Sequence, residues 1–287
     1  MPARQPFTAL CQLAARGRHA GRADLHLHTT HSDGTYTPAE VVDLARRSGL
    51  SAIAITDHDT LSGILAARAA AVGSPVEVIV GIEITSDYQG RELHLLAFFV
   101  ALDNEPLNAA LEAIRRHRVE RLREMRQRLQ QAGVSIPDAD VVLPASPDAV
   151  GRRHLAEQLV QAGRAATIRE AFARYLHDRS PFVVPKQRLP VAEAIRLVRV
   201  AGGVAAWAHP SYDCTQDSLL ELREMGLGAV EVEFPDVRNS RSRQLRAWAA
   251  GLGLAVTAGS DCHGPGRRTL GCYSVSAEEL EQLRQLV

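Results

Sequence analysis

The stretch from Asp24 to Gly34 constrains this chain most, because it sets two histidines in an alternating pattern just before a turn. It reads Asp-Leu-His-Leu-His-Thr-Thr-His-Ser-Asp-Gly. If its first residues form a β-strand, Leu25 and Leu27 point to one face and His26 and His28 to the other. Two ordinary, partly buried histidines would also fit this pattern. However, neutral imidazole is a common ligand of zinc, manganese and iron, so the pair can hold one ion.

Further candidate ligands stand where apolar runs end. One run ends in Asp57-His58-Asp59, the next carries Glu83 near its end, and two later runs end at His209 and at Gly259-Ser260-Asp261-Cys262-His263. The carboxyl ends of strands are where active sites form in α/β folds. With the turn carboxylate and a histidine on the segment after Glu83, the candidate metal ligands are His26, His28, Asp33, His58, Glu83, His94, His209, Asp261 and His263.

This ligand set is too large for a single ion that keeps a position open for water. It fits two or three divalent ions that share bridging carboxylates. Crowded carboxylates would repel each other unless such cations neutralised them. Mixed imidazole and carboxylate sites favour manganese, iron or zinc, and we expect manganese, with zinc or iron as alternatives. Cys262, between two candidates, is expected to point away, and Glu231 and Glu233 near another strand end are interpreted as structural.

Strand and helix patterns alternate along most of the chain, which predicts an α/β fold with parallel strands and right-handed crossovers. Thr37-Pro38 and Gly49 bracket one predicted helix with an N-cap, a first-turn proline and a C-terminal glycine. A second helix is expected over Leu61 to Ala71, capped by Asp59 or Thr60. Glu83 to Phe99 reads as a hairpin, which would distort a regular barrel.

The 287 residues are enough for one barrel-sized domain plus an insertion. Residues 101–179 show helical periodicity without strands and are expected to form an inserted helical lid domain. Residues 23–100 and 180–287 would form the barrel. Residues 1–22 contain several arginines and no acid, and their apolar run is too short and broken for a secretory signal, so we expect a disordered N-terminal extension.

Composition excludes several other classes of protein. The formal net charge is zero, so any preference for phosphate must come from a local basic patch. The four cysteines show no Cys-x-x-Cys spacing, which argues against a zinc ribbon or a disulfide framework. No apolar run approaches the roughly 20 residues that span a bilayer. We therefore expect a cytoplasmic protein without membrane contact, and no obligate protein partner is evident.

The predicted insertion carries basic side chains that could face the metal site. Arg118 interrupts the apolar stripe of a long predicted helix; such an arginine often extends its charge to water, but on a lid it could face bound phosphate. Arginine suits phosphate because its planar fork donates two hydrogen bonds and keeps its proton. The candidate substrate-binding residues are Arg118, Arg121, Arg152, His154 and Lys186, the last being the only lysine in the chain.

Taken together, these motifs resemble those of the PHP (polymerase and histidinol phosphatase) superfamily from about Ala23 to the C-terminus. Gly151-Arg152-Arg153-His154 and Pro181 to Lys186 resemble its small bacterial branch of 3′,5′-nucleoside bisphosphate phosphatases and exoribonucleases, although that pattern often has a proline at the position of Arg153. The resemblance implies a distorted TIM-like (β/α)7 barrel with an inserted helical domain. It also implies that Glu83 bridges two ions and that Asp261 is a terminal ligand.

These expectations define a reaction. A hydroxide that bridges the metal ions would attack a phosphate ester in line, with Glu83 as the bridge and Asp261 or His209 handling the proton. Two groups of basic residues outside the metal site, Arg118 with Arg121, and Arg152 with His154 and Lys186, favour a substrate with a second phosphate. We expect a 3′,5′-nucleoside bisphosphate, cleaved to nucleoside 5′-monophosphate and phosphate, with the 5′ end of a short RNA as the alternative.

Three other functions remain open. Histidinol-phosphate phosphatase would use the same fold and metals, but the arginine clusters would then be superfluous. A metal-dependent amidohydrolase would also have His-x-His on its first strand, but the only lysine lies outside any predicted strand end and cannot bridge metals there. A degenerate metal-binding module would lack activity, which the complete ligand set argues against. A serine nucleophile has no support, because no Gly-x-Ser-x-Gly elbow occurs.

Overall fold

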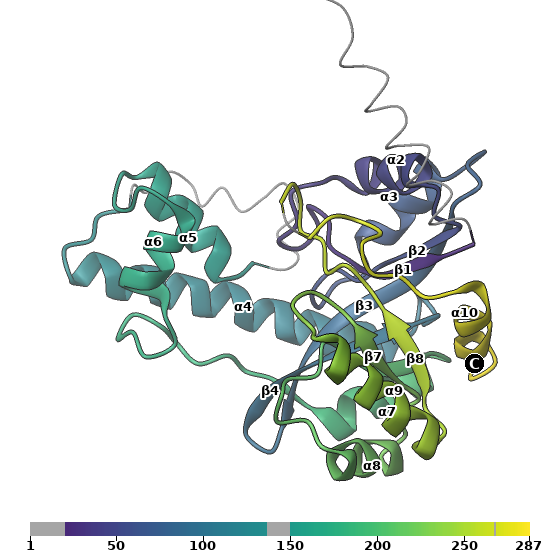
Figure 1. The fold of residues 1–287 in the computed structure, drawn as a ribbon. Helices are drawn as coiled ribbons and strands as arrows, with labels where there is room; N and C mark the ends of the chain where they lie inside the picture. The colour runs from purple at the N-terminus through teal and green to yellow at the C-terminus, as the bar shows by residue number, and fades with distance from the viewer. Residues whose placement is uncertain (1–20, 137–149, 267) are drawn as a thin grey trace, which may run out of the picture.

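The computed structural model describes residues 21–136, 150–266 and 268–287, and within these ranges a single sheet curls into a nearly closed barrel (Figure 1). Its strands are β1 (Ala23–Leu27), β2 (Ala52–Ile55), β3 (Glu77–Tyr88), β4 (Arg91–Phe98), β5 (Leu189–Pro190), β6 (Val204–Trp207), β7 (Ala229–Glu233) and β8 (Ala255–Ala258). The helices are α2 (Pro38–Ser48), α3 (Gly63–Ala70), α4 (Glu105–Gln131), α5 (Arg152–Gln161), α6 (Ile168–Ala171), the π-helical turn η1 (Phe172–Leu176), α7 (Val191–Val200), α8 (Gln216–Glu224), α9 (Asn239–Leu252) and α10 (Ala277–Arg284).

The strand order confirms the distorted seven-stranded α/β barrel. The order is β1-β2-β3-β4-β6-β7-β8, and the short β5 pairs with β3 outside this path. β1 to β3 are parallel, as are β6 to β8, whereas β4 is antiparallel to both β3 and β6. The predicted hairpin is therefore present, and it is the element that breaks the regular β/α repeat.

The barrel closes between β1 and the end of β8. Leu27 forms an isolated parallel bridge with Cys262, and the His28 amide donates to the Cys262 carbonyl at 3.0 Å. The closure depends on Gly259, because a Cβ atom built there would overlap the Cβ and backbone of His26. A residue without a side chain is thus required where β8 approaches the first candidate ligand.

One expectation about β1 is wrong. Leu25 belongs to a core cluster drawn from strands all around the barrel, whereas Leu27 belongs to the outer core that packs under the helices. The pairing of β1 with β2 shifts register between Asp24 and Leu27. Such a bulge reverses the alternation of side chains beyond it. His26 and His28 nevertheless share a face as predicted, with ring centroids 5.2 Å apart.

The predicted caps of α2 are confirmed, whereas the predicted N-cap of α3 is wrong. The Thr37 hydroxyl accepts from the Glu40 amide, and Gly49 ends α2 in the left-handed conformation at φ 78°. In contrast, α3 begins after Ser62, and neither Asp59 nor Thr60 is its N-cap residue. Asp59 is instead buried and binds Thr85 and Arg118, as described below.

The long helix α4 connects the barrel to a group of smaller helices at its side (Figure 1). Its first half packs Leu107 and Leu111 into the outer core of the barrel, and its second half packs Met125 and Leu129 into a separate cluster with α5. We keep the division into barrel and lid, with boundaries at 101 and 179, as a proposal. Residues 137–149 of this predicted lid, and 1–20 of the predicted extension, lie outside the described residues.

None of the helices in the described part of the chain is long and apolar enough to cross a membrane.

Candidate metal centre

The buried carboxylate of Glu83 lies at the centre of the nine candidate ligands. Its Oε2 atom faces the two histidines of the β1 segment, 3.4 Å from His26 Nε2 and 3.2 Å from His28 Nε2. The same oxygen is 3.0 Å from His58 Nδ1. Glu83 lies within β3 and His58 follows the end of β2, and an isolated bridge between the two residues holds these segments together.

The second oxygen of Glu83 faces a different pair of imidazoles. Oε1 lies 2.7 Å from His94 Nδ1, on the antiparallel strand β4, and 3.1 Å from His209 Nε2, after β6. Burial would raise the pKa of Glu83, but His58, His94 and His26 hold it well below its ordinary value. An ionised carboxylate whose two oxygens face separate histidine groups has the geometry of a bridging metal ligand.

Asp261 completes the group around the β1 histidines. Its Oδ1 atom is 3.5 Å from His26 Nε2 and 3.3 Å from His28 Nε2. Its Oδ2 atom is bound by the guanidinium of Arg268. Cys262, the next residue, packs into the outer core, so it points away from the ligands as expected.

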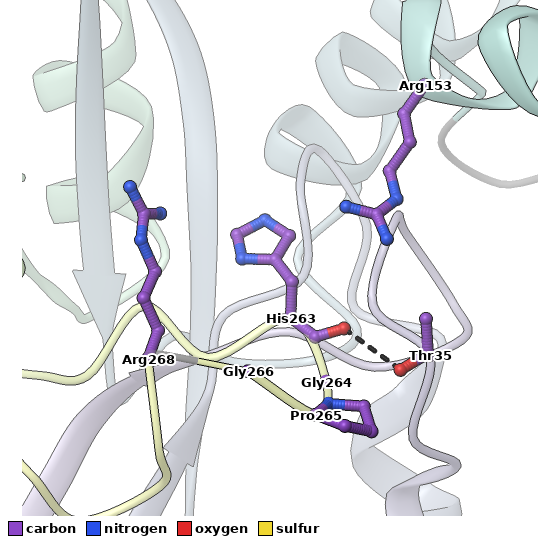
Figure 2. Close-up of a pocket in the computed structure, with 7 residues that line it drawn as sticks. All are labelled: Thr35, Arg153, His263, Gly264, Pro265, Gly266 and Arg268. Carbon is purple, nitrogen blue, oxygen red and sulfur yellow. Dashed lines mark hydrogen bonds between the residues drawn. The ribbon is translucent and has the colours of Figure 1, made fainter. Parts of the chain in front are cut away.

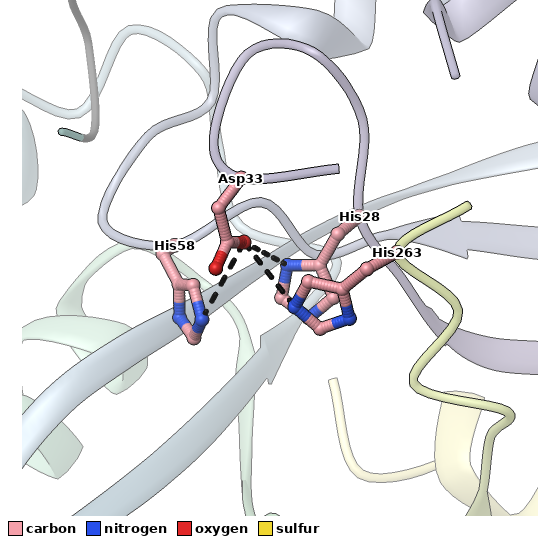
Figure 3. A group of neighbouring side chains, drawn as sticks. All are labelled: His28, Asp33, His58 and His263. Carbon is pink, nitrogen blue, oxygen red and sulfur yellow. Dashed lines mark ion pairs between the residues drawn. The ribbon is translucent and has the colours of Figure 1, made fainter. Parts of the chain in front are cut away.

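A third group forms around Asp33, in the turn after β1 (Figure 3). Asp33 Oδ1 lies 3.2 Å from His263 Nε2 and 3.9 Å from both His28 Nδ1 and His58 Nε2. The ligand atoms of these four residues all lie within 4.8 Å of one another. The structure thus brings all nine predicted ligands to one edge of the barrel, in three overlapping groups.

Several atoms in this centre are buried without a hydrogen-bond partner among the described residues. They are His26 Nε2, His28 Nε2, Asp33 Oδ1, His58 Nδ1 and Glu83 Oε2. Buried polar atoms are almost always paired, and leaving one unpaired costs about 1–3 kcal/mol. All five are donor atoms for a metal, and they converge. Divalent cations therefore fit this site.

Glu231 on β7 orients two of the ligands, which the sequence interpretation did not specify. Its Oε1 atom is 3.1 Å from His26 Nδ1, and its Oε2 atom accepts from the His209 amide at 2.5 Å. Hydrogen bonding at one ring nitrogen fixes which nitrogen of a ligand histidine faces the metal. Glu233 is different, since it pairs with Arg246 at 2.7 Å on the outside of the barrel. In the sequence, only the position of Glu231 on a strand beside ligand-bearing strands pointed to it, and Glu233 shares that position.

Two further buried aspartates hold the ligand loops in place. Asp57 accepts from the amide and hydroxyl of Thr29, both at 2.7 Å, and from Ser32 Oγ at 2.6 Å, which fixes the turn that carries Asp33. Asp24 accepts from the amide and hydroxyl of Ser260 at 2.9 and 2.6 Å, next to Asp261. Burial raises the pKa of Asp24 to about 6 in spite of these bonds.

The backbone is strained at three residues of the site. Asp59, His209 and Asp261 have φ values of 52°, 29° and 48°. Residues other than glycine rarely adopt this left-handed region, and where they do, the strain often accompanies function. The three residues follow β2, β6 and β8, respectively, at the edge of the barrel where the candidate ligands meet.

Arg118, the first predicted substrate-binding residue, lies over this centre and is already bound to protein. Its Nε atom donates to Asp59 Oδ2 at 2.8 Å, and its Nη2 atom donates to Thr85 Oγ1 at 2.9 Å. Asp59 is fully buried, so this pair fixes α4 against the barrel. Burial opposes the charge of Arg118, but Asp59 raises its pKa above the ordinary value.

Arg121 and Arg152 lie close to Arg118. Burial, together with the charges of Arg152 and Arg118, lowers the pKa of Arg121 to about 10. Arg121 Nε donates to the Val184 carbonyl at 2.6 Å, and Arg152 Nη1 donates to the Leu176 carbonyl at 3.1 Å and to Asp178 Oδ1 at 2.5 Å. The three guanidinium groups thus crowd one region.

Lys186, on the segment between η1 and β5, lies near Arg118 and Arg121. Its Nζ atom lies 2.6 Å from Glu92 Oε1, which is itself 2.9 Å from His94 Nε2. Burial lowers the pKa of Lys186, as do the charges of Arg118 and Arg121. His154 is placed differently, because its Nδ1 atom accepts from the Gly151 amide at 3.1 Å, at the start of α5. We call Arg118, Arg121, Arg152 and Lys186 the basic cluster, and its binding to substrate stays a prediction.

A pocket beside His263 contains basic residues that the sequence analysis did not assign. Figure 2 shows Arg153 entering it from α5 and Arg268 standing on the other side of His263, with Thr35 in the wall. Arg268 follows the Gly-Ser-Asp-Cys-His motif by a few residues, and that proximity was the only signal in the sequence.

Comparisons with known proteins agree with this geometry. The family model of the PHP domain matches residues 24–177. A 5′-3′ exoribonuclease of Haemophilus influenzae is 32% identical, over 84% of this chain and 90% of its own length. A 3′,5′-nucleoside bisphosphate phosphatase of Chromobacterium violaceum is 31% identical, over 85% of this chain and 87% of its own.

Two solved structures are similar throughout. A Bifidobacterium adolescentis protein, described as a supposed metal-dependent phosphoesterase, has a TM-score of 0.85 at 32% identity. A Chromobacterium violaceum protein, described as an amidohydrolase with bound sulfate and no metal, has a TM-score of 0.81 at 28% identity. Each comparison covers 92% of this chain and 96% of the other.

Proposed function

The chain belongs to the PHP domain family and is a metal-dependent phosphoesterase, and we propose that its substrate is a small nucleotide with two phosphates. The proposed reaction converts a 3′,5′-nucleoside bisphosphate into a nucleoside 5′-monophosphate and phosphate. The observation that carries this proposal is the basic cluster, which lies beside the metal centre and contacts it through Glu92 and His94. A second phosphate could bind there while the first is hydrolysed.

The nine ligands suggest three positions for divalent ions, with Glu83 shared between two of them. His26, His28, Glu83 and Asp261 would hold one ion, Glu83 with His94 and His209 a second, and Asp33 with His58 and His263 a third. We propose manganese, with zinc or iron as alternatives that the same ligand chemistry accepts. When bound, such ions supply hydroxide at neutral pH and neutralise charge on the phosphate.

Side chains of this chain would bind the second phosphate and transfer the proton. Arg118, Arg121 and Arg152 would bind the 5′ phosphate through charge-assisted hydrogen bonds. Asp261 would accept the proton of the attacking water and return it to the ribose 3′ oxygen as the bond from phosphorus to that oxygen breaks. His209 is the alternative for this proton transfer, because its imidazole also faces the centre, beside Glu83.

The test is a comparison of kcat/KM in the presence of manganese. The substrates are adenosine 3′,5′-bisphosphate, 5′-AMP, 3′-AMP, histidinol phosphate and a 5′-phosphorylated trinucleotide. The proposal predicts that both substrates with a second phosphate group exceed the monophosphates. A preference for histidinol phosphate or for a plain monophosphate would contradict it.

An exoribonuclease acting on short RNA is the second candidate, and it is favoured by the relative of that name and by the basic pocket beside His263. The rival amidohydrolase reading has less support, although one similar structure carries that name. It would call for a lysine between the metals, whereas the only lysine of the chain, Lys186, pairs with Glu92.

A further inference from the structure

Two consecutive arginines at the start of α5 contribute to different surfaces. Arg152 turns toward Asp178 and the other arginines of the basic cluster. Arg153 lines the pocket beside His263, together with Arg268 and Thr35 (Figure 2). The basic cluster lies near His94, through Lys186 and Glu92, whereas the pocket lies at His263, which belongs to the group around Asp33. The first turn of α5 therefore reaches two regions of the metal centre.

The guanidinium groups of this pocket are only partly used by protein contacts. Arg153 pairs with Glu157 at 3.3 Å along the helix, and its side chain is 37% exposed. Arg268 binds Asp261 Oδ2, and its side chain is 47% exposed. An arginine carries five donor hydrogens, so each retains donors that can face a ligand. No acid is among the described residues that line this pocket; the acids paired with lining residues are Glu157 with Arg153, Asp261 with Arg268, and Asp33 with His263.

Two arginines around an open pocket suit a phosphate that lies next to the one being hydrolysed. We propose that Arg153 and Arg268 bind the phosphodiester that follows the scissile phosphate in a short 5′-phosphorylated oligonucleotide. This rests on the proposed function, in which the basic cluster holds the 5′ phosphate and the metal centre holds the scissile phosphate. A nucleoside bisphosphate ends at the metal centre and leaves the pocket unused.

The same chemistry serves both substrates. In each, the oxygen of water bonds to phosphorus, the bond from phosphorus to the ribose 3′ oxygen breaks, and a proton moves to that oxygen. The bisphosphate gives a nucleoside 5′-monophosphate and inorganic phosphate. The oligonucleotide gives a nucleoside 5′-monophosphate and a 5′-phosphorylated chain that is one nucleotide shorter. The pocket therefore determines how well longer substrates compete, without changing the bond that is cut.

The experiment compares kcat/KM of Arg153→Ala and Arg174→Ala with wild type, for adenosine 3′,5′-bisphosphate and for 5′-phosphorylated triadenylate. Arg174 is a matched control, because it is also on the lid surface and pairs with an acid, Glu170, one helical turn away. Loss of one charge-assisted bond predicts a fall of about tenfold for the trinucleotide with Arg153→Ala. The bisphosphate should change less than about twofold, as should both substrates with Arg174→Ala. An equal change for both substrates with Arg153→Ala, or no change for either, overturns the proposal.

Binding provides a readout that does not depend on turnover. The Kd of a fluorescent 5′-phosphorylated trinucleotide is measured by anisotropy with chelator present, at several salt concentrations. Arg153→Ala should weaken binding and reduce the salt slope by about 0.7, the value for one phosphate contact on a single strand. Arg153→Lys, which keeps the charge, should restore most of the slope. If wild type hydrolyses neither substrate, the proposed function fails. Independently of that result, an unchanged Kd and salt slope in Arg153→Ala would overturn the proposed binding of the phosphodiester in this pocket.

Discussion

Glu83 Oε1 lies 2.7 Å from His94 Nδ1, while its other oxygen faces the buried histidines that follow the bulge in β1. One carboxylate thus connects the antiparallel hairpin to the parallel strands of the barrel. The distortion of the barrel is therefore part of the site, because β4 is the strand that brings His94 to Glu83. If Glu83 bridges two ions, its loss should affect both at once.

Replacing Glu83 with glutamine should remove bound metal and lower kcat/KM by more than about 100-fold, beyond the 10–100-fold typical of residues that only orient a ligand. Metal content is measured by elemental analysis, and activity by phosphate release. Glu77→Gln is the matched control on the same strand, since Glu77 forms an exposed pair with Arg284. Full metal content in Glu83→Gln would refute the bridging role.

Glu231→Gln should lower metal affinity by about 10–100-fold while the fold is retained. The amide can accept from the His209 backbone, but it cannot present a carboxylate to His26 Nδ1. The measurement is the manganese concentration that gives half-maximal activity. Glu233→Gln, on the same strand, should leave it unchanged, because Glu233 pairs with Arg246 outside the site.

Arg152→Ala should chiefly raise KM for the bisphosphate, by about tenfold or more, with a smaller effect on kcat, since the arginine would bind the phosphate that does not react. Steady-state kinetics with adenosine 3′,5′-bisphosphate test this. Asp178→Asn is the control, because it removes the negative charge paired with Arg152 but keeps the cation. An unchanged KM in Arg152→Ala would mean that the basic cluster is not the second phosphate site.

Chelation should lower the melting temperature of the wild-type protein. Ligands that bind only the native state stabilise it by about 2.7 kcal/mol at 100 times their Kd, and 1 kcal/mol shifts the midpoint by roughly 2–4 °C in a domain of this size. A fall of about 5–10 °C is therefore expected on adding chelator to manganese-loaded protein. Glu83→Gln should show little or none of this fall, and an equal fall in both proteins would point to an effect unrelated to the centre.

Gly259→Ala should lower the melting temperature and metal content, because the added Cβ overlaps His26 where the barrel closes. Gly251→Ala, in α9, meets nothing within 4 Å and should be neutral or stabilising by up to about 1 kcal/mol, since alanine is the better helix former. Thermal melts of the two variants compare a close backbone approach with an open helix surface. Similar melting temperatures would contradict the close approach.

The meeting of the candidate ligands at one edge of the barrel could be predicted from the sequence, because their positions follow a general rule. His58, His209 and Asp261 follow apolar runs and Glu83 lies near the end of one, and the carboxyl ends of parallel strands meet at one edge of a barrel. The hairpin of β3 and β4 could also be predicted from the sequence, because Gln89-Gly90 is typical of a turn.

Features that depend on how residues distant in the sequence pair in the folded chain could not be predicted from the sequence. The bulge in β1 separates Leu25 from Leu27 although the sequence alternates without a break, because a bulge is set by how two strands pair. The position of Asp59 before a helix predicts a capping residue, but its carboxylate instead accepts from Arg118, which is distant in the sequence. Arg268 lies in a loop, whose path no periodicity predicts, and it reaches Asp261 only in the folded chain.

The most direct test of the central claim is to identify the products formed from adenosine 3′,5′-bisphosphate by the manganese-loaded protein, using phosphorus NMR. The account predicts inorganic phosphate and 5′-AMP in equal amounts, with turnover lost in Asp261→Asn. Formation of 3′-AMP would reverse the proposed orientation of the two phosphates. No release of phosphate from either position, by protein shown to contain manganese, would contradict the proposed substrate.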